Sequence, residues 1–170
     1  MLSTPYFRVY TCRDIRGVEL GGALKNIVAI ATGLANGLQL GYNAQAAIID
    51  RGIAEIMRMA QKLGGAEPLT FLGLSGMGDL ILTCTGPLSR NRTVGIKLGE
   101  GKKLADIVRE LGGVAEGVYT ARSAYELVTR EKIDMPITEQ IYKILYEDRT
   151  PQQAVRELMS RDLKEESDFS

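Results

Sequence analysis

The sequence predicts an all-α, multi-helix domain, on three observations. From Gly17 onward, apolar residues recur at intervals of three and four, the spacing that lines one face of an α-helix. Only residues 6–14, YFRVYTCRD, alternate apolar and polar side chains with the period of two that is typical of a strand. With 45% hydrophobic and 25% charged residues over 170 positions, the chain has the composition of a globular protein with a core.

The strand-like segment comes first and has no partner. A strand needs a neighbour because its backbone N–H and C=O groups must be hydrogen-bonded across a ladder. Since residues 6–14 are the one good strand pattern in the chain, we interpret them as the end of a sheet that lies elsewhere.

The helices follow in order. The first two are long, and the glycines and proline of LGGAEP, residues 63–68, end the second one. The sequence GLSGMGD, residues 73–79, is a glycine-rich turn that opens a short helix, DLILTC. Further helical patterns cover residues 92–98, 104–111, 118–132, 138–146 and 151–159, before a polar tail.

Charge and composition exclude several function classes. The 21 basic residues balance 21 acidic ones and the sequence pI is about 6.4, so no overall field favours nucleic acid or an anionic membrane as a partner. Lys25 and Asn26 interrupt the longest apolar region, residues 24–40, which makes it too polar for a membrane span. Cys12 and Cys84 have no metal-ligand spacing and there is no histidine, which argues against a zinc site or a disulfide framework and favours the reducing cytoplasm.

Lys25 is the first candidate for chemistry. Its helical neighbours Gly21, Gly22 and Ala29 are small, whereas the opposite face carries large aliphatic residues. One interpretation is a tightly packed helix whose lysine extends to solvent. The other is close approach of a ligand to a partly buried lysine, which desolvation turns into a usable general acid or base.

A second candidate is the stretch from Asp79 to Arg92. Asp79 and Ser89 each stand at a helix start, where a cap is the ordinary role. Ser89, Arg90 and Asn91 also place backbone N–H groups, a guanidinium and an amide at one helix start, which is how a neutral protein builds a local phosphate site.

A third candidate is Glu116, which follows a glycine-rich turn and precedes a helix. It serves either as a capping acid or as an acceptor for a ligand. The chain contains neither GxGxxG nor GxxxxGK[ST], so it lacks the usual loop of a dinucleotide or nucleotide site.

Taken together and in order, STPYFRVYT, GVELGGALKN, GLSGMGDLILTC, SRNR, VAEG and MPITEQIYKILYE resemble the C-terminal half of bacterial NAD(P)-dependent glycerol-3-phosphate dehydrogenase. The resemblance runs from Ser3 to about Met159. It implies an all-helical substrate domain similar to the C-terminal domain of 6-phosphogluconate dehydrogenase. Residues 1–16 are then the last strand and linker of a missing Rossmann domain, 17–160 the helical catalytic domain and 161–170 a polar tail.

The resemblance also implies roles for individual residues. Lys25 corresponds to the family's proton acceptor, with Asp79 as its catalytic companion. Glycerol 3-phosphate or dihydroxyacetone phosphate would be held by Lys25, Asn26, Asp79, Thr83, Ser89, Arg90 and Asn91. NAD or NADP, bound mainly by the absent domain, would touch Arg90, Val114 and Glu116. No metal is implied, and the family suggests a cytoplasmic homodimer that supplies glycerophospholipid synthesis.

Two alternatives stay open from the sequence. One is the helical domain of another reductase of the same superfamily, such as a ketopantoate or UDP-sugar dehydrogenase, although SRNR after GDLILTC speaks against it. The other is a non-catalytic helical module for binding or dimerisation, in which Lys25 and Arg90 are ordinary surface or capping residues. The isolated chain is expected to be inactive as an enzyme, because without the Rossmann half nothing presents a hydride.

Overall fold

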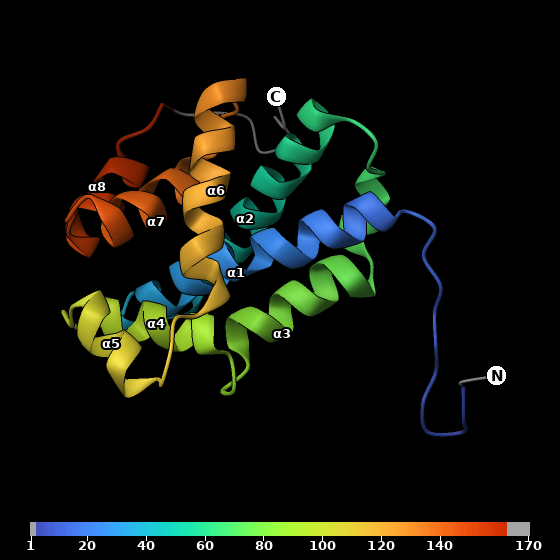
Figure 1. The fold of residues 1–170 in the computed structure, drawn as a ribbon, viewed down its shortest axis with the longest axis horizontal. Helices are drawn as coiled ribbons and strands as arrows, with labels where there is room; N and C mark the ends of the chain where they lie inside the picture. Colours follow the sequence, from blue (N-terminus) through green and yellow to red (C-terminus); the bar gives the residue numbers. More distant parts are fainter. Residues whose placement is uncertain (1–2, 163–170) are drawn as a thin grey trace.

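The computed structural model describes residues 3–162, and helices dominate them (Figure 1). A 3₁₀ turn, η1 (Pro68–Leu72), and a π-helical turn, η2 (Leu74–Gly78), connect the second and third α-helices. The α-helices are α1 (Ile15–Gly37), α2 (Gly41–Leu63), α3 (Asp79–Thr85), α4 (Arg90–Gly99), α5 (Leu104–Glu110), α6 (Glu116–Glu131), α7 (Pro136–Tyr146) and α8 (Pro151–Met159). The all-α prediction is confirmed.

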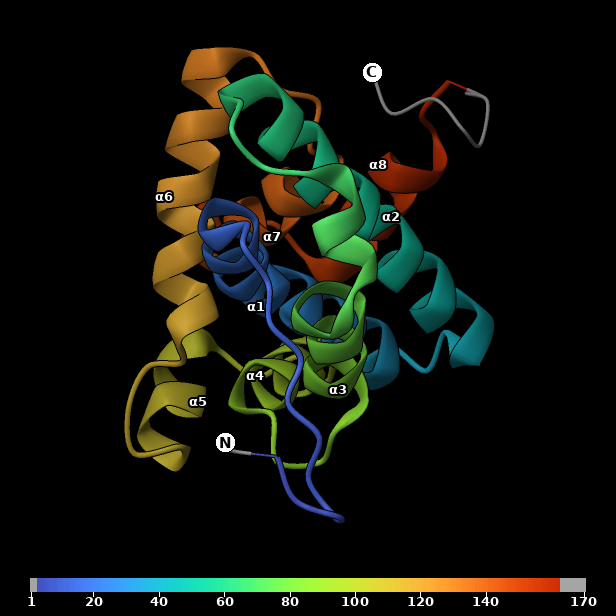
Figure 2. The same cartoon turned by 90° about the vertical axis from the view of Figure 1, so that its right-hand side faces the viewer.

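Helix α1 runs through the middle of the domain and packs against α2, α3, α4 and α6 (Figure 1). Figure 2 shows α2 and α6 on opposite sides of α1, with α3 and α4 below it. Every residue from Asn26 to Ala35 is buried. By length and composition α1 is apolar enough to cross a membrane, but 67% of its most apolar 18-residue window is buried inside the domain, as in the core helix of a soluble protein.

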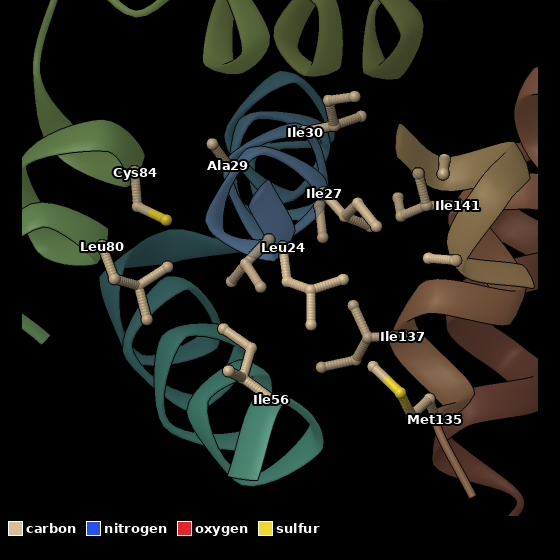
Figure 3. Close-up of a cluster of buried hydrophobic side chains, with 14 of the residues drawn as sticks. Leu24, Ile27, Ala29, Ile30, Ile56, Leu80, Cys84, Met135, Ile137 and Ile141 are labelled. Carbon is tan, nitrogen blue, oxygen red and sulfur yellow. The ribbon is translucent and has the colours of Figure 1, made fainter. Parts of the chain in front are cut away.

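The hydrophobic core surrounds α1 (Figure 3). Leu24 and Ile27 face Ile56 of α2 and Ile137 of α7, and Leu80 of α3 closes the same cluster. Full burial of an aliphatic side chain of this size contributes about 1.5–3 kcal/mol, so this cluster supplies much of what holds α2, α3 and α7 to α1.

Helices α1 and α4 cross so closely that their backbones touch, and glycines at the crossing make this possible. A Cβ atom added at Gly95 would lie 2.0 Å from the Ile30 carbonyl oxygen, and one added at Gly33 would lie 2.1 Å from the Arg92 carbonyl oxygen. Distances this short leave no room for any side chain at either position. The crossing therefore fixes the start of α4 relative to the middle of α1.

The segment predicted as a strand, residues 6–14, is not a strand. Among the described residues there is one isolated bridge, between Thr4 and Phe7, and residues 7–13 are exposed (Figure 1). The period-two pattern reports burial on one face of a sheet, and the described part of the chain offers no partner strand. Helix α1 begins at Ile15, where the Asp14 side chain accepts hydrogen bonds from Gly17 N at 2.8 Å, Glu67 N at 2.8 Å and Thr70 Oγ1 at 2.7 Å.

The glycine-rich sequence at residues 73–79 is also different from its prediction as a turn. Residues 74–78 form the π-helical turn η2, which runs directly into α3. The last part of the predicted polar tail, residues 163–170, lies outside the described residues.

Helix α7 is capped by a residue from another helix. Its own N-cap, Met135, makes no side-chain hydrogen bond, and Pro136 has no N–H. Instead, the buried carboxylate of Glu55 in α2 accepts from Ile137 N at 2.5 Å, Thr138 N at 3.1 Å and Thr138 Oγ1 at 2.9 Å. Burial raises the pKa of Glu55 from 4.5 to about 7, against the hydrogen bonds from Ile137 and Thr138 and the charge of Arg58.

Candidate active site

Lys25, Asp79 and Thr83 lie together between α1 and α3. The Lys25 ammonium donates to Asp79 Oδ2, and the Lys25 and Asp79 side chains are 21% and 37% exposed. Thr83, one helical turn after Asp79, donates its hydroxyl to the Asp79 carbonyl oxygen at 2.6 Å and lies 3.4 Å from Asp79 Oδ1. The result is a cation, an anion and a hydroxyl that are partly open to solvent, in a set that can stabilise and move a proton.

The π-helical turn places Asp79. A Cβ atom at Gly76 would lie 2.3 Å from the Phe71 carbonyl oxygen, so only glycine allows η2 to fold back on η1. Phe71 itself is 1% exposed and anchors this connection in the core. Asp79 makes no capping bond to its own helix; its side chain reaches across to α1 instead.

Space is open beside Lys25 on α1. A Cβ atom added at Gly22, three residues before the lysine, would meet nothing within 4 Å. At Gly21 it would touch the Phe71 ring at an ordinary 3.5 Å. Of the two interpretations of the Gly-Gly pair, close helix packing accounts for Gly21, whereas Gly22 leaves room next to the ammonium.

The start of α4 forms a second group. Ser89 is its N-cap, and its hydroxyl oxygen accepts from Arg92 N at 3.2 Å. Arg90 is exposed and donates Nη2 to the carbonyl oxygens of Gly113 at 2.9 Å and Leu111 at 3.4 Å. These two bonds hold one edge of the guanidinium, and its remaining N–H groups have no protein partner within residues 3–162.

Asn26 and Asn91 join the two groups. Asn91 Nδ2 donates to Asn26 Oδ1 at 2.8 Å, and Asn91 Oδ1 accepts from Gly117 N at 2.9 Å. Both asparagines are buried, at 7% and 9% exposure. Because Asn26 follows Lys25 and Asn91 follows Arg90, this buried hydrogen bond ties the part of α1 that carries Lys25 to the start of α4 that carries Arg90.

The predicted cofactor contacts lie in the connector from α5 to α6. Val114 follows the Gly113 carbonyl that holds Arg90, and it packs partly against the core. Glu116 is the exposed first residue of α6 and precedes Gly117. Arg90, Val114 and Glu116 are thus on one connected stretch of backbone, although no hydrogen bond joins their side chains among the described residues.

No group of three metal-ligating side chains occurs within the described part of the chain. A surface depression of about 880 Å³ lies along α8 and the connector between α7 and α8. It is lined by charged and polar residues such as Arg149 and Glu157, which pair with each other, and by none of the candidate site residues.

Two functional features escaped the sequence. Gly117 N donates to Asn91, which donates to Asn26, and we call these linked hydrogen bonds the asparagine chain. The only sequence signal for this role of Gly117 was a glycine directly after Glu116 at a helix start. Glu55 had a clearer signal, because a helix that begins MPIT has no side-chain acceptor at its own N-cap and needs one from elsewhere.

Comparison with known families decides the identity of this domain. The family described as the C-terminus of NAD-dependent glycerol-3-phosphate dehydrogenase matches residues 14–156. The chain belongs to this family. The matched range starts at Asp14, the N-cap of α1, and so covers the helical domain and leaves out the segment that precedes it.

Curated members of the glycerol-3-phosphate dehydrogenase family agree over almost the whole chain. The protein named glycerol-3-phosphate dehydrogenase [NAD(P)+] from Geobacter sulfurreducens is 60% identical over 166 residues, which are 98% of this chain and 49% of that protein. The protein of the same name from Solidesulfovibrio magneticus is 59% identical over 97% of this chain and 50% of its own length. The chain spans about half the length of the curated relatives that it matches.

Solved glycerol-3-phosphate dehydrogenases share the fold of this domain. The crystal structure from Coxiella burnetii has 48% identity and a TM-score of 0.89, and the match covers 94% of this chain and 49% of that one. The structure from Saccharomyces cerevisiae has 31% identity and a TM-score of 0.84, with 94% and 46% covered.

Proposed function

We propose that this chain is the substrate domain of an enzyme that interconverts sn-glycerol 3-phosphate and dihydroxyacetone phosphate with NAD(H) or NADP(H). The observation that carries the proposal is the partly exposed ion pair of Lys25 with Asp79, beside the open space at Gly22. Membership of the family supports the reaction class, and the matching motifs support the residues.

The proton step falls to Lys25. In the oxidation of glycerol 3-phosphate, the neutral Lys25 amine takes the proton of the C2 hydroxyl group as the C2–H hydride leaves. In the reverse direction the ammonium returns that proton to the carbonyl oxygen. Asp79 stabilises the ammonium and, with Thr83 on its other oxygen, keeps it oriented.

Arg90 and its neighbours suit the phosphate group. A planar guanidinium with one edge held by the Leu111 and Gly113 carbonyls still offers N–H donors on its remaining positions. Arg90 also lies beside the connector that carries Val114. This arrangement suits contact with an anionic part of a dinucleotide, but it does not form a complete dinucleotide-binding site. When bound, the nicotinamide supplies or accepts the hydride at C2.

The whole-enzyme properties belong to the same proposal. We assign residues 1–16 to the end of the dinucleotide-binding half and its linker, with NAD or NADP held mainly by that half. We place the enzyme in the cytoplasm as a homodimer that feeds glycerophospholipid synthesis. On this view the isolated chain lacks a hydride source and is inactive. Activity that returns when a separate N-terminal half is added would support this view, and light scattering of the full-length enzyme tests the dimer.

The test of the catalytic role is Lys25→Met in the full-length enzyme. We expect turnover to fall by about 10²–10⁴-fold, the usual value of a positioned acid or base. Lys143→Met is the matched control, because Lys143 is 17% exposed and also pairs with a carboxylate, that of Glu139, on a helix that carries none of the candidate site residues. Wild-type turnover in Lys25→Met would refute the proposed role.

A further inference from the structure

One backbone donor fixes the direction of the asparagine chain. A backbone N–H can only donate, so the atom of Asn91 that faces Gly117 N at 2.9 Å must be the side-chain oxygen. Asn91 Nδ2 then faces Asn26 and donates to Asn26 Oδ1 at 2.8 Å. The order of oxygen and nitrogen in both side-chain amides thus follows from Gly117, although their shapes alone would allow either order.

Asn26 is left with its amide nitrogen toward the turn of α1 that holds Gly22. Asn26 Nδ2 donates to the Gly22 carbonyl oxygen across 3.4 Å, which is long for an N–H···O bond. Its second N–H has no protein partner within residues 3–162. A side chain that is 93% buried and keeps an unmet donor is unusual, and it suits an acceptor supplied by a ligand.

The surroundings of that donor suit a ligand. Asn26 directly follows Lys25, and a Cβ atom added at Gly22 would have nothing within 4 Å of it, so a small molecule has room one helical turn from the ammonium. The carbonyl, hydroxyl and phosphate oxygens of a phosphorylated three-carbon substrate accept hydrogen bonds, and the Asn26 N–H is a donor for such an oxygen at this position.

Gly117 must be a glycine for the chain to form. A Cβ atom there would lie 2.7 Å from Asn91 Oδ1 and 2.8 Å from the Asn26 carbonyl oxygen, closer than side-chain carbons approach such atoms. The missing side chain lets the first turn of α6 come down onto α1 and α4, so that its N–H reaches Asn91.

We propose that Gly117 and Asn91 are positioning residues that hold the Asn26 amide with its nitrogen toward the substrate beside Lys25. The site thereby selects an oxygen acceptor at this point and rejects a donor. The nature of the ligand rests on the proposed function, whereas the direction of the hydrogen-bond chain does not.

The direction can be measured directly in the 170-residue chain labelled with ¹⁵N and ¹³C. NMR couplings across hydrogen bonds should connect the Gly117 amide nitrogen to Asn91 Cγ, and the Asn91 side-chain nitrogen to Asn26 Cγ. A coupling from the Asn26 side-chain nitrogen to Asn91 Cγ would overturn the proposal. So would a Gly117 amide that lacks the coupling and exchanges with water as fast as an exposed amide.

The consequence for binding is tested by Asn91→Asp in the full-length enzyme. The new carboxylate has nearly the shape of asparagine but no N–H, so Asn26 must turn its nitrogen toward it and present its oxygen to the substrate. Thr93→Asp adds the same charge two residues further along α4, at a position outside the candidate site, and leaves the asparagine chain intact. We expect the KM for dihydroxyacetone phosphate to be at least about 10-fold higher in Asn91→Asp than in Thr93→Asp. Equal KM values would show an effect of charge alone and would overturn the positioning role.

Discussion

The stability of the domain is expected to fall between about pH 4.5 and pH 7 because of one carboxyl group, that of Glu55. This side chain is 3% exposed, and burial raises its pKa from 4.5 to about 7. The perturbation to make is Glu55→Gln, which removes the titration and keeps an acceptor at the start of α7. One N–H of Ile137 or Thr138 then loses its partner, which costs about 1–3 kcal/mol.

The size and direction of the effect follow from the two pKa values of Glu55. The folded state favours the protonated form, because its pKa of about 7 lies above the 4.5 of the unfolded chain. The contribution to stability is therefore complete below pH 4.5, is lost as the pH rises to about 7, and changes little above that. At about 1.4 kcal/mol per pKa unit the loss is about 3 kcal/mol, or about 6–12 °C in Tm for a domain of this size.

Urea unfolding of both proteins at pH values from 4.5 to 8.5 measures this effect. Other titrating groups act alike in the two proteins, so the difference between wild type and Glu55→Gln isolates Glu55. Between pH 4.5 and pH 7, the free energy of unfolding of the wild type should fall by about 3 kcal/mol relative to that of Glu55→Gln. A difference that is constant over this range would refute the raised pKa, and one that moves in favour of the wild type would show that the helix N–H groups hold the carboxylate ionised.

Further predictions concern the helix crossing and the site. Gly95→Ala should lower the free energy of unfolding by about 1–3 kcal/mol or more, because the added methyl group overlaps the Ile30 carbonyl oxygen; an unchanged urea midpoint would contradict the close crossing. Gly22→Ala is its matched control and should stabilise the isolated chain by up to about 1 kcal/mol, since its methyl group meets nothing. In the full-length enzyme the same Gly22→Ala change should raise the substrate KM, and an unaltered KM would mean that the space beside Lys25 is not used. Arg90→Lys should weaken phosphate binding by about 10-fold, because lysine lacks the planar fork that meets carbonyls and anion together; an unchanged KM would refute this assignment.

The sequence predicted the helices well because their packing leaves a direct trace in the spacing of apolar residues. Helix α1 is buried on nearly every side, and the nearly continuous apolar sequence from Leu24 to Leu34 predicts this burial. The pattern at residues 6–14 misled because a period of two is typical of burial on one face of a sheet, and the described residues supply no partner strand.

Candidate site residues could be named from the sequence, but the distances between them could not. Lys25 and Asp79 are 54 positions apart, and only the fold of η1 and η2 between them brings the two charges together. For Asn91 the resemblance implied a contact with substrate, and nothing in the sequence predicted its buried hydrogen bond with Gly117 N. That bond depends on how α6 packs on α4.

The central position of α1 has a consequence for the order in which the domain opens. Backbone amides from Ala29 to Ala35 are buried, so their hydrogen exchange requires disruption of the whole core, whereas α5 and α8 each bury one residue and can open locally. Lys25 stands on the same helix. The backbone that carries the Lys25 ammonium should therefore stay in place while α5 and α8 open locally.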